Sequence, residues 1–350
     1  MTNPFAPLPE TKSPPSSIII ERVQPEIDGG RYPIKRVVGD VLQVTADIFK
    51  DSHDKIAAVL QYRRRSDAEW QEAEMRLVEN DRWAGEFLLP DNTRYLYTIA
   101  AFPDVWATWS DEVAKKHAAG QDIALELTEG RLILEEALSR AIGADQEILA
   151  SAITLAAGEA SQAAKVQHLL GEDVALAMQR ARSRAGEARY PRELEATVDR
   201  TAARFAAWYE FFPRSAGTDP ARSATFAEAA QRLPDIAAMG FDVVYLTPIH
   251  PIGTAFRKGK NNTLIPEPGD PGVPYAIGSP DGGHDAIEPG LGTLEDFRRF
   301  VTAAGGLGLE VALDLALQAS PDHPWATEHP EWFSVRPDGS IRYAENPPKK

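Results

Sequence analysis

The alternation of apolar runs and helical segments after residue 204 constrains the fold more than any other feature of this sequence. Arg204–Phe212 is predicted to be a strand, and Thr225 with Glu228 forms the capping-box pattern that opens a helix, which Gly240 ends. The next predicted strand, Phe241–Thr247, is nearly all apolar, as in the strands of a parallel sheet that are buried on both faces.

A second helix and a third strand repeat this order. Thr293 is a candidate cap for the helix, and Leu309–Leu315 forms a third buried strand. Such an order implies right-handed parallel crossovers, in either a doubly wound sheet or the first part of a (β/α)8 barrel. A nucleotide-binding sheet needs a short glycine-rich turn, whereas residues 248–292 separate the second strand from its helix. Long loops at the carboxyl ends of strands are typical of barrel active sites, so the barrel of TIM type is favoured.

Upstream of this region the sequence changes character twice. Residues 1–15 are predicted to be a disordered tail, 16–111 an all-β sandwich of short alternating strands, and 112–200 a helical bundle segment punctuated by glycines. Residues 201–350 form the predicted barrel part, with its long loop at 248–292. Two tryptophan pairs fall within the predicted sandwich, Trp70 with Trp83 and Trp106 with Trp109; they predict either a sugar-binding platform or, more simply, core packing.

The composition excludes several classes of protein. The net charge of −15 argues against non-specific binding of nucleic acid, and the absence of cysteine excludes disulfides and thiolate metal sites. No apolar run is long enough for a membrane span, and the proline-rich start Met1–Pro15 lacks the apolar core of a signal peptide, so the expected location is the cytoplasm. Ligand spacings typical of a metal site are absent from the sequence, and no cofactor is predicted.

Three segments carry a resemblance to glycoside hydrolase family 13, the α-amylase family. Val243–Ile249 resembles the second barrel strand of that family, and Gly282–Phe297 resembles its segment of pattern gY-D…dp.lGt.edf. Glu310–Leu315 is similar to the first catalytic-site region, but Gln318 and Ala319 replace the Asn-His pair of the family pattern. This departure argues against ordinary starch hydrolysis.

Four motifs together resemble one subfamily, the α-1,4-glucan:maltose-1-phosphate maltosyltransferases. They are Pro248–Gly253, Arg257–Asn262, Leu313–Trp325 and Ala344–Lys350. The resemblance implies transfer of a maltosyl unit from maltose 1-phosphate to an α-1,4-glucan, with release of phosphate and retention of configuration. It also implies a homodimer.

The resemblance implies a set of substrate-binding residues. Lys258 and Asn262 would contact the non-reducing glucose of the donor, Gln318 and Asn346 the glucose next to the reacting bond, and Lys349 the phosphate. A phosphate leaving group needs fixed cations and amide donors, which these residue types supply. Without the motif, a lysine such as Lys258 in a Gly/Asn loop is usually only solvated.

Four further residues are predicted to support the site. His250 lies between two prolines, where it either braces the loop through a backbone hydrogen bond or contacts the sugar. His284 and Asp285 lie where the family places its substrate-loop pair, and Asp314, at a strand end, is expected to be ionised and to orient its neighbours. His323 and His329 are interpreted as structural.

The catalytic carboxylates are not among the candidates. Retaining transfer needs a nucleophilic Asp and an acid/base Glu about 5 to 5.5 Å apart, and by resemblance both lie beyond residue 350. Residues 201–350 are fewer than the ~250 of a full barrel, so a truncated barrel, inactive alone, is expected. The alternative functions are an amylase-type hydrolase, a trehalose-forming isomerase and a non-catalytic glucan-binding protein.

Overall fold

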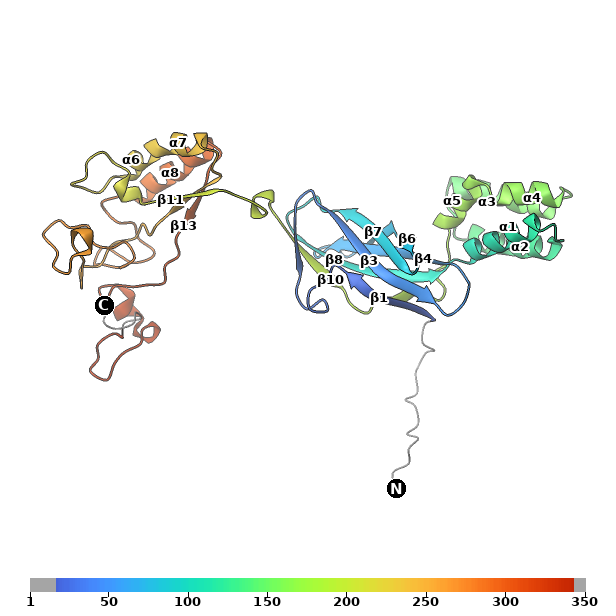
Figure 1. Ribbon diagram of the computed structural model, residues 1–350, viewed down its shortest axis with the longest axis horizontal. Coiled ribbons are helices and arrows are strands. Elements are labelled where there is room, and N and C mark those ends of the chain that lie inside the picture. The colour runs from blue at the N-terminus through green and yellow to red at the C-terminus, as the bar shows by residue number, and fades with distance from the viewer. Residues whose placement is uncertain (1–16, 343–350) are drawn as a thin grey trace, which may run out of the picture. The chain divides into compact units, whose positions relative to one another are not determined.

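The computed structural model describes residues 17–342 (Figure 1). The predicted tail, 1–15, and the candidate site residues Asn346 and Lys349 lie outside these described residues. The chain divides into two compact units, the first ending at Arg204 and the second beginning at Phe205.

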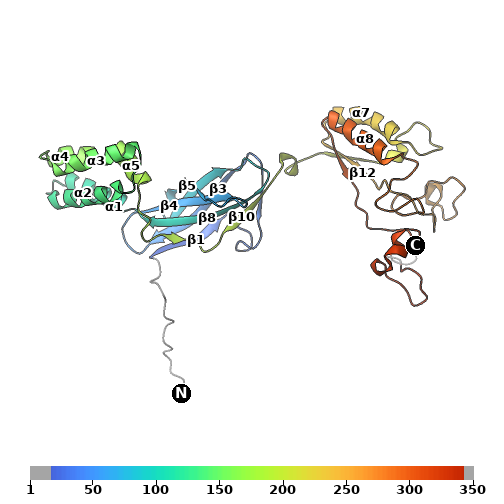
Figure 2. The ribbon, with the colours of Figure 1, turned by 180° about the vertical axis from the view of Figure 1, so that it is seen from behind.

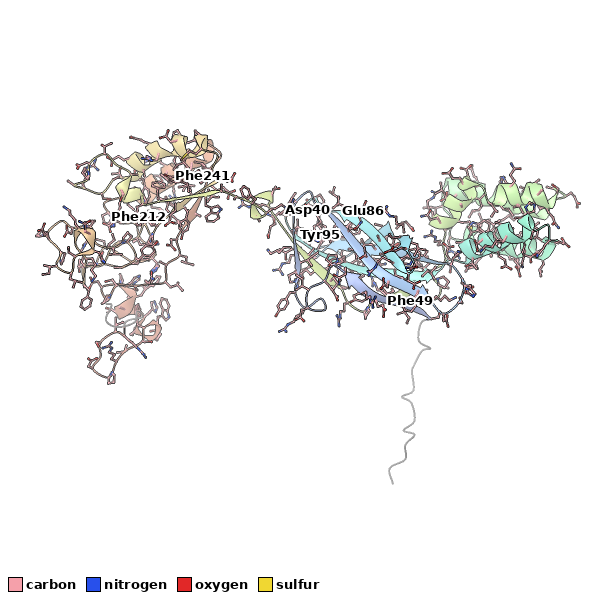
Figure 3. All side chains as sticks on the ribbon, in the orientation of Figure 1. Asp40, Phe49, Glu86, Tyr95, Phe212 and Phe241 are labelled. Carbon is pink, nitrogen blue, oxygen red and sulfur yellow. The ribbon has the colours of Figure 1, made fainter. Side chains whose placement is uncertain are left out.

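Two sheets of short strands build the larger part of the first unit. One sheet has the order β1-β3-β7-β6, and the other has the order β2-β10-β8-β4-β5 with β9 beside β8. The strands are β1 (Ile18–Gln24), β2 (Ile34–Val37), β3 (Val41–Lys50), β4 (Ile56–Arg64), β5 (Gln71–Glu74), β6 (Arg76–Glu79), β7 (Arg82–Leu88), β8 (Arg94–Pro103), β9 (Ala188–Arg189) and β10 (Leu194–Asp199). Residues from both sheets share one apolar core, including Val44, Leu60 and Ile99, against which Tyr95 packs from β8 (Figure 3).

The last strand of this sandwich corrects the predicted domain boundary. The sequence predicts a helical segment over all of 112–200, whereas β10 pairs with β8 in antiparallel and with β2 in parallel orientation. The alternation of buried Leu194, Ala196 and Val198 is the strand pattern that the sequence shows locally. Its partners lie about a hundred residues or more upstream, so only the folded chain reveals which sheet it joins.

The described part of the first unit also contains five α-helices. They are α1 (Val105–Ala118), α2 (Ala124–Leu138), α3 (Ala144–Ala157), α4 (Gln162–Leu169) and α5 (Glu172–Arg180). The Asp104 carboxylate caps α1 by accepting a hydrogen bond of 2.9 Å from the Ala107 N–H, which otherwise has no partner inside the helix.

Trp106 and Trp109 lie on α1 and not in the sandwich, contrary to the predicted boundary. Their rings stack with centroids 4.5 Å apart, and both belong to the helical core with exposed fractions of 7% and 4%. The Trp109 indole N–H donates to the Glu126 carbonyl at 2.7 Å. This pair therefore serves core packing, the simpler of its two predicted roles.

The second unit is built on three parallel strands in the order β11-β12-β13. They are β11 (Trp208–Phe211), β12 (Val243–Leu246) and β13 (Glu310–Leu313). The helices α6 (Phe226–Ala229), α7 (Leu233–Ala238) and α8 (Leu294–Gly306) lie on one side of this sheet (Figures 1 and 2). Phe241 packs edge-on against Tyr209 with ring centroids 5.1 Å apart (Figure 3).

Local sequence signals fix the helix starts of this unit. Thr225 and Glu228 form a complete capping box at α6, and Thr293 and Asp296 form another at α8.

The third strand, in contrast, is not the buried strand that the sequence predicts. Leu313 is 42% exposed, because β13 lies at the edge of the described sheet and pairs only with β12 there.

Between residues 17 and 342, the structure contains no helix with the length and apolar character needed to cross a membrane.

Candidate functional site

The carboxyl ends of β12 and β13 bring together the segments that carry the candidate residues. The strands run parallel with Leu246 opposite Leu313, and the Asp314 N–H donates to the Leu246 carbonyl at 3.0 Å. Thr247 and Asp314 therefore leave the sheet side by side. The chain after Thr247 enters the long loop, and α9 (Trp325–Glu328) follows Asp314.

Asp314 contacts two tyrosines. Tyr245 on β12 and Tyr275 in the long loop lie close enough to its carboxylate for Asp314 to add to the effect of burial and raise the pKa of both phenols. Burial, followed by the hydrogen bond and negative charge of Asp314, raises the pKa of Tyr275 to about 12. Tyr275 is not among the residues predicted from the sequence, although an aromatic residue within a Gly- and Pro-rich loop is a signal that could have marked it.

Three histidines from distant parts of the chain form a cluster. The His250 Nδ1 lies 3.0 Å from the Ala286 carbonyl, so this side chain braces the loop as one of its two predicted roles requires. His284 lies between His250 and His323, with ring centroids 5.5 and 5.1 Å away, and stacks flat on Trp325 at 5.4 Å. Burial lowers the pKa of His250 and of His323.

The histidine cluster is not arranged as a metal site. In the part of the chain that the structure describes, no three His, Asp or Glu side chains converge in a way that could hold a metal ion.

Half-buried carboxylates hold the long loop in place. The Asp322 Oδ2 accepts hydrogen bonds from the Thr254 N–H, the Thr254 hydroxyl and the Ala255 N–H, at 2.6 to 2.7 Å. Glu288 accepts from the Ile252 N–H at 3.0 Å. Burial alone would raise the pKa of Asp322, but these hydrogen bonds outweigh it and lower the pKa below its usual value.

Replacing Asp322 with asparagine is expected to destabilise the second unit by about 2 kcal/mol, the scale of hydrogen bonds to a charged acceptor. The wild-type contribution has a defined pH dependence. Because the folded-state pKa is depressed, the stabilisation is present above the unfolded pKa near 3.8 and is lost as the pH falls through the folded value. Urea unfolding at neutral pH measures the effect, with the exposed Asp281→Asn in the same loop as control. Equal stability of the two variants would contradict it.

The cations of the loop differ in their surroundings. Arg257 donates to the Pro271 carbonyl at 3.0 Å, and Arg214 donates to the Gly272 carbonyl at 3.1 Å. Both guanidinium groups thus hold the loop backbone. Lys258 is half-buried, whereas Lys260 and Asn262 are exposed, and Asn262 has a positive φ of 61°.

The structure brings only some of the predicted residues into contact. His250 and His284 meet in one cluster, with Asp285 close enough to act electrostatically on His250 and His323. Gln318 is exposed. Among residues 17–342, no described contact joins Lys258 or Asn262 to Gln318, so their convergence on one sugar stays a prediction. Trp325 was missed as a member of the cluster; its place in a His-Pro-Trp run was the available signal.

These features define a multidomain chain in which a sandwich and a helical segment precede a parallel α/β sheet with a polar loop at its carboxyl ends. A family model described as "Alpha-1,4-glucan:maltose-1-phosphate maltosyltransferase, domain N/S" matches residues 16–200. The chain belongs to the α-1,4-glucan:maltose-1-phosphate maltosyltransferase family.

Individual relatives carry the same name. The maltosyltransferase of Myxococcus xanthus is 50% identical over 341 residues, covering 95% of this chain and 51% of the relative. That of Burkholderia pseudomallei is 50% identical over 335 residues, covering 95% of this chain and 30% of the relative. That of Chlorobaculum tepidum is 47% identical over 333 residues, covering 95% of this chain and 50% of the relative. The chain therefore spans about half the length, or less, of these curated relatives.

Among solved structures, an α-amylase from Lactobacillus plantarum matches 40% of this chain and 29% of its own, with 37% sequence identity and a TM-score of 0.33.

Proposed function

We propose that the protein transfers a maltosyl unit from α-maltose 1-phosphate to the non-reducing end of an α-1,4-glucan, releasing phosphate with retention of configuration. The observation that carries this proposal is the family membership, together with relatives named as maltosyltransferases that are about half identical along 95% of the chain. The printed names supply both substrates. A homodimer and a cytoplasmic location are part of the same proposal.

The proposed architecture of the second unit is the first part of a (β/α)8 barrel. Three adjacent parallel strands in sequence order, with helices on one face, support it. In such a barrel the loops after the strands build the active site. The long loop after β12 and the segment after β13 occupy that position and carry the proposed site residues.

The proposed substrate contacts are made by Lys258, Asn262 and Gln318, with Asn346 and Lys349 outside the described residues. Lys258 and Asn262 bind the non-reducing glucose, because a cation and an amide side by side can satisfy sugar hydroxyls that both donate and accept. Gln318 and Asn346 bind the glucose next to the reacting bond, and Lys349 binds the phosphate. His250, His284, Asp285 and Asp314 support the site by holding the long loop and the segment after β13.

A direct assay tests the proposed reaction. The whole protein, incubated with maltose 1-phosphate and a maltooligosaccharide, is expected to release one phosphate for each maltosyl unit added, so that the acceptor grows by two glucose units. Phosphate release and product length by chromatography measure both quantities. Release of free maltose without acceptor growth would identify a hydrolase instead, and no release of phosphate would reject the donor.

A further inference from the structure

The positions of the protons on His323 are fixed by its partners. This side chain is buried, with an exposed fraction of 1%. The backbone N–H of Trp325 donates to the His323 Nδ1 at 3.1 Å, so Nδ1 carries a lone pair and not a proton. A neutral His323 then carries its single proton on Nε2, which lies 2.9 Å from the His284 Nδ1.

The partners of His284 place its proton on the same nitrogen, Nε2. The His284 Nε2 lies 2.7 Å from the Ala316 carbonyl, which can only accept, so Nε2 carries the proton. Its Nδ1 is therefore free to accept from His323. The hydrogen bonds run in one direction, from the Trp325 N–H through His323 and His284 to the Ala316 carbonyl. Each of the two imidazole rings carries one proton. A second proton on His323 would point at the Trp325 N–H, and a second proton on His284 would point at the His323 Nε2–H, so two donors would face each other.

We propose that His323 is a positioning residue of the candidate site: in its neutral form it holds His284 in one tautomer and thereby fixes the long loop against the segment that follows β13. The functional half of this proposal rests on the maltosyltransferase activity proposed above. The segments concerned carry His284 and Asp285 on one side and the stretch from Ala316 to Trp325 on the other.

The surrounding backbone is built to fit this one side chain. A Cβ on Gly283 would lie 2.2 Å from the His323 Cε1, and a Cβ on Gly278 would lie 2.5 Å from the His323 Cβ. Two positions of the long loop are thus glycine where any side chain would displace His323. Such close packing on both sides leaves the ring no room to flip and exchange its nitrogen positions.

The charged groups near His323 set the direction of its pH response. Burial disfavours its cation most, and His284 and His250 add to this effect, whereas the carboxylates of Asp285 and Glu328 oppose it. The net result is a pKa below 6.5 in the folded state. A depressed histidine pKa contributes stability that is present above the unfolded pKa near 6.5 and is lost as the pH falls below that value. His250 shifts in the same direction.

Nuclear magnetic resonance of the histidine nitrogens tests the proton assignment on the unmodified chain. In protein labelled with heavy nitrogen in its seven histidines, His284 and His323 are expected to appear as neutral Nε2–H tautomers at neutral pH. His323 should remain neutral at a pH just below the ordinary histidine pKa of about 6.5. An Nδ1–H tautomer at either ring, or protonation of His323 at or above about pH 6.5, would overturn the proposal.

Kinetic measurements on the whole protein test whether His323 positions the site for catalysis. His323→Gln keeps an amide donor that can reach His284 but cannot be protonated, whereas His323→Ala removes both hydrogen bonds. We expect His323→Ala to raise the KM for the donor about tenfold with a smaller change in kcat. His323→Gln should restore most of this loss and make the acid limb of kcat/KM less steep, and His168→Gln is the control.

The positioning role of His323 and the proposed activity would be rejected by different results. Identical pH profiles and equal KM values for wild type and His323→Ala would show that His323 has no positioning role. If the wild-type protein transfers no maltosyl unit, the proposed function is wrong, and the nitrogen spectra still decide the proton assignment.

Discussion

Replacing Gly278 with alanine is expected to destabilise the second unit by roughly 2 to 6 kcal/mol. Gly278 has a φ of +109°, a conformation that side chains rarely adopt, and this strain alone costs on the order of 1 to 3 kcal/mol. The new Cβ would also lie 2.5 Å from the His323 Cβ and 2.6 Å from its Cα. Because a backbone atom cannot rotate aside as a side-chain tip can, overpacking adds a further ~1 to 3 kcal/mol.

A matched control separates these two contributions. Gly269 in the same loop has a similar φ of +91°, but no heavy atom lies within 4 Å of the point where its Cβ would be, so Gly269→Ala carries the conformational strain only. Urea unfolding followed by tryptophan fluorescence measures both variants. A loss for Gly278→Ala no larger than that for Gly269→Ala would show that the loop does not pack on His323 as described.

The features that sequence reasoning located correctly depend on nearby residues. The capping boxes at Thr225 and Thr293 join groups three residues apart, so the pattern of residue types is sufficient to place the helix starts. The order of strands and helices in the second unit follows from the same local periodicity and from the handedness of parallel crossovers.

The features that sequence reasoning missed depend on long-range contacts. The sequence around Leu194–Asp199 alternates like a strand, but its partners β2 and β8 end at Val37 and Pro103, far upstream in the chain. The sequence alone supports a structural role for His323, but its hydrogen bond to His284 joins residues 39 positions apart and could not be read from the local sequence. The local sequence does not reveal the partners of β10 or of His323, because the residue types involved are also common in loops and helices.

Lys258→Ala is expected to raise the KM for maltose 1-phosphate by about 5- to 150-fold, corresponding to the ~1 to 3 kcal/mol of a hydrogen bond to a charged group. Half-burial limits the freedom of the Lys258 side chain, so less entropy is lost when it binds a ligand. The neighbouring Lys260 is exposed, and Lys260→Ala removes the same charge from the same loop. This control should change KM by less than about twofold, because an exposed, solvated charge contributes little.

The chemical group that Lys258 contacts can be identified with a second ligand. If its ammonium group binds the hydroxyls of the non-reducing glucose, Lys258→Ala should also weaken inhibition by maltose, which carries no phosphate. The inhibition constant of maltose should then rise by the same factor as the KM for the donor. If Lys258 instead binds the phosphate, inhibition by maltose should be unchanged, and the effect on the donor should shrink at high ionic strength, because salt screens charge–charge attraction. Equal behaviour of Lys258→Ala and Lys260→Ala with both ligands would show that Lys258 is only a solvated cation. The site would then have to be sought around Gln318 and Asp314, at the end of β13, without a contribution from the long loop.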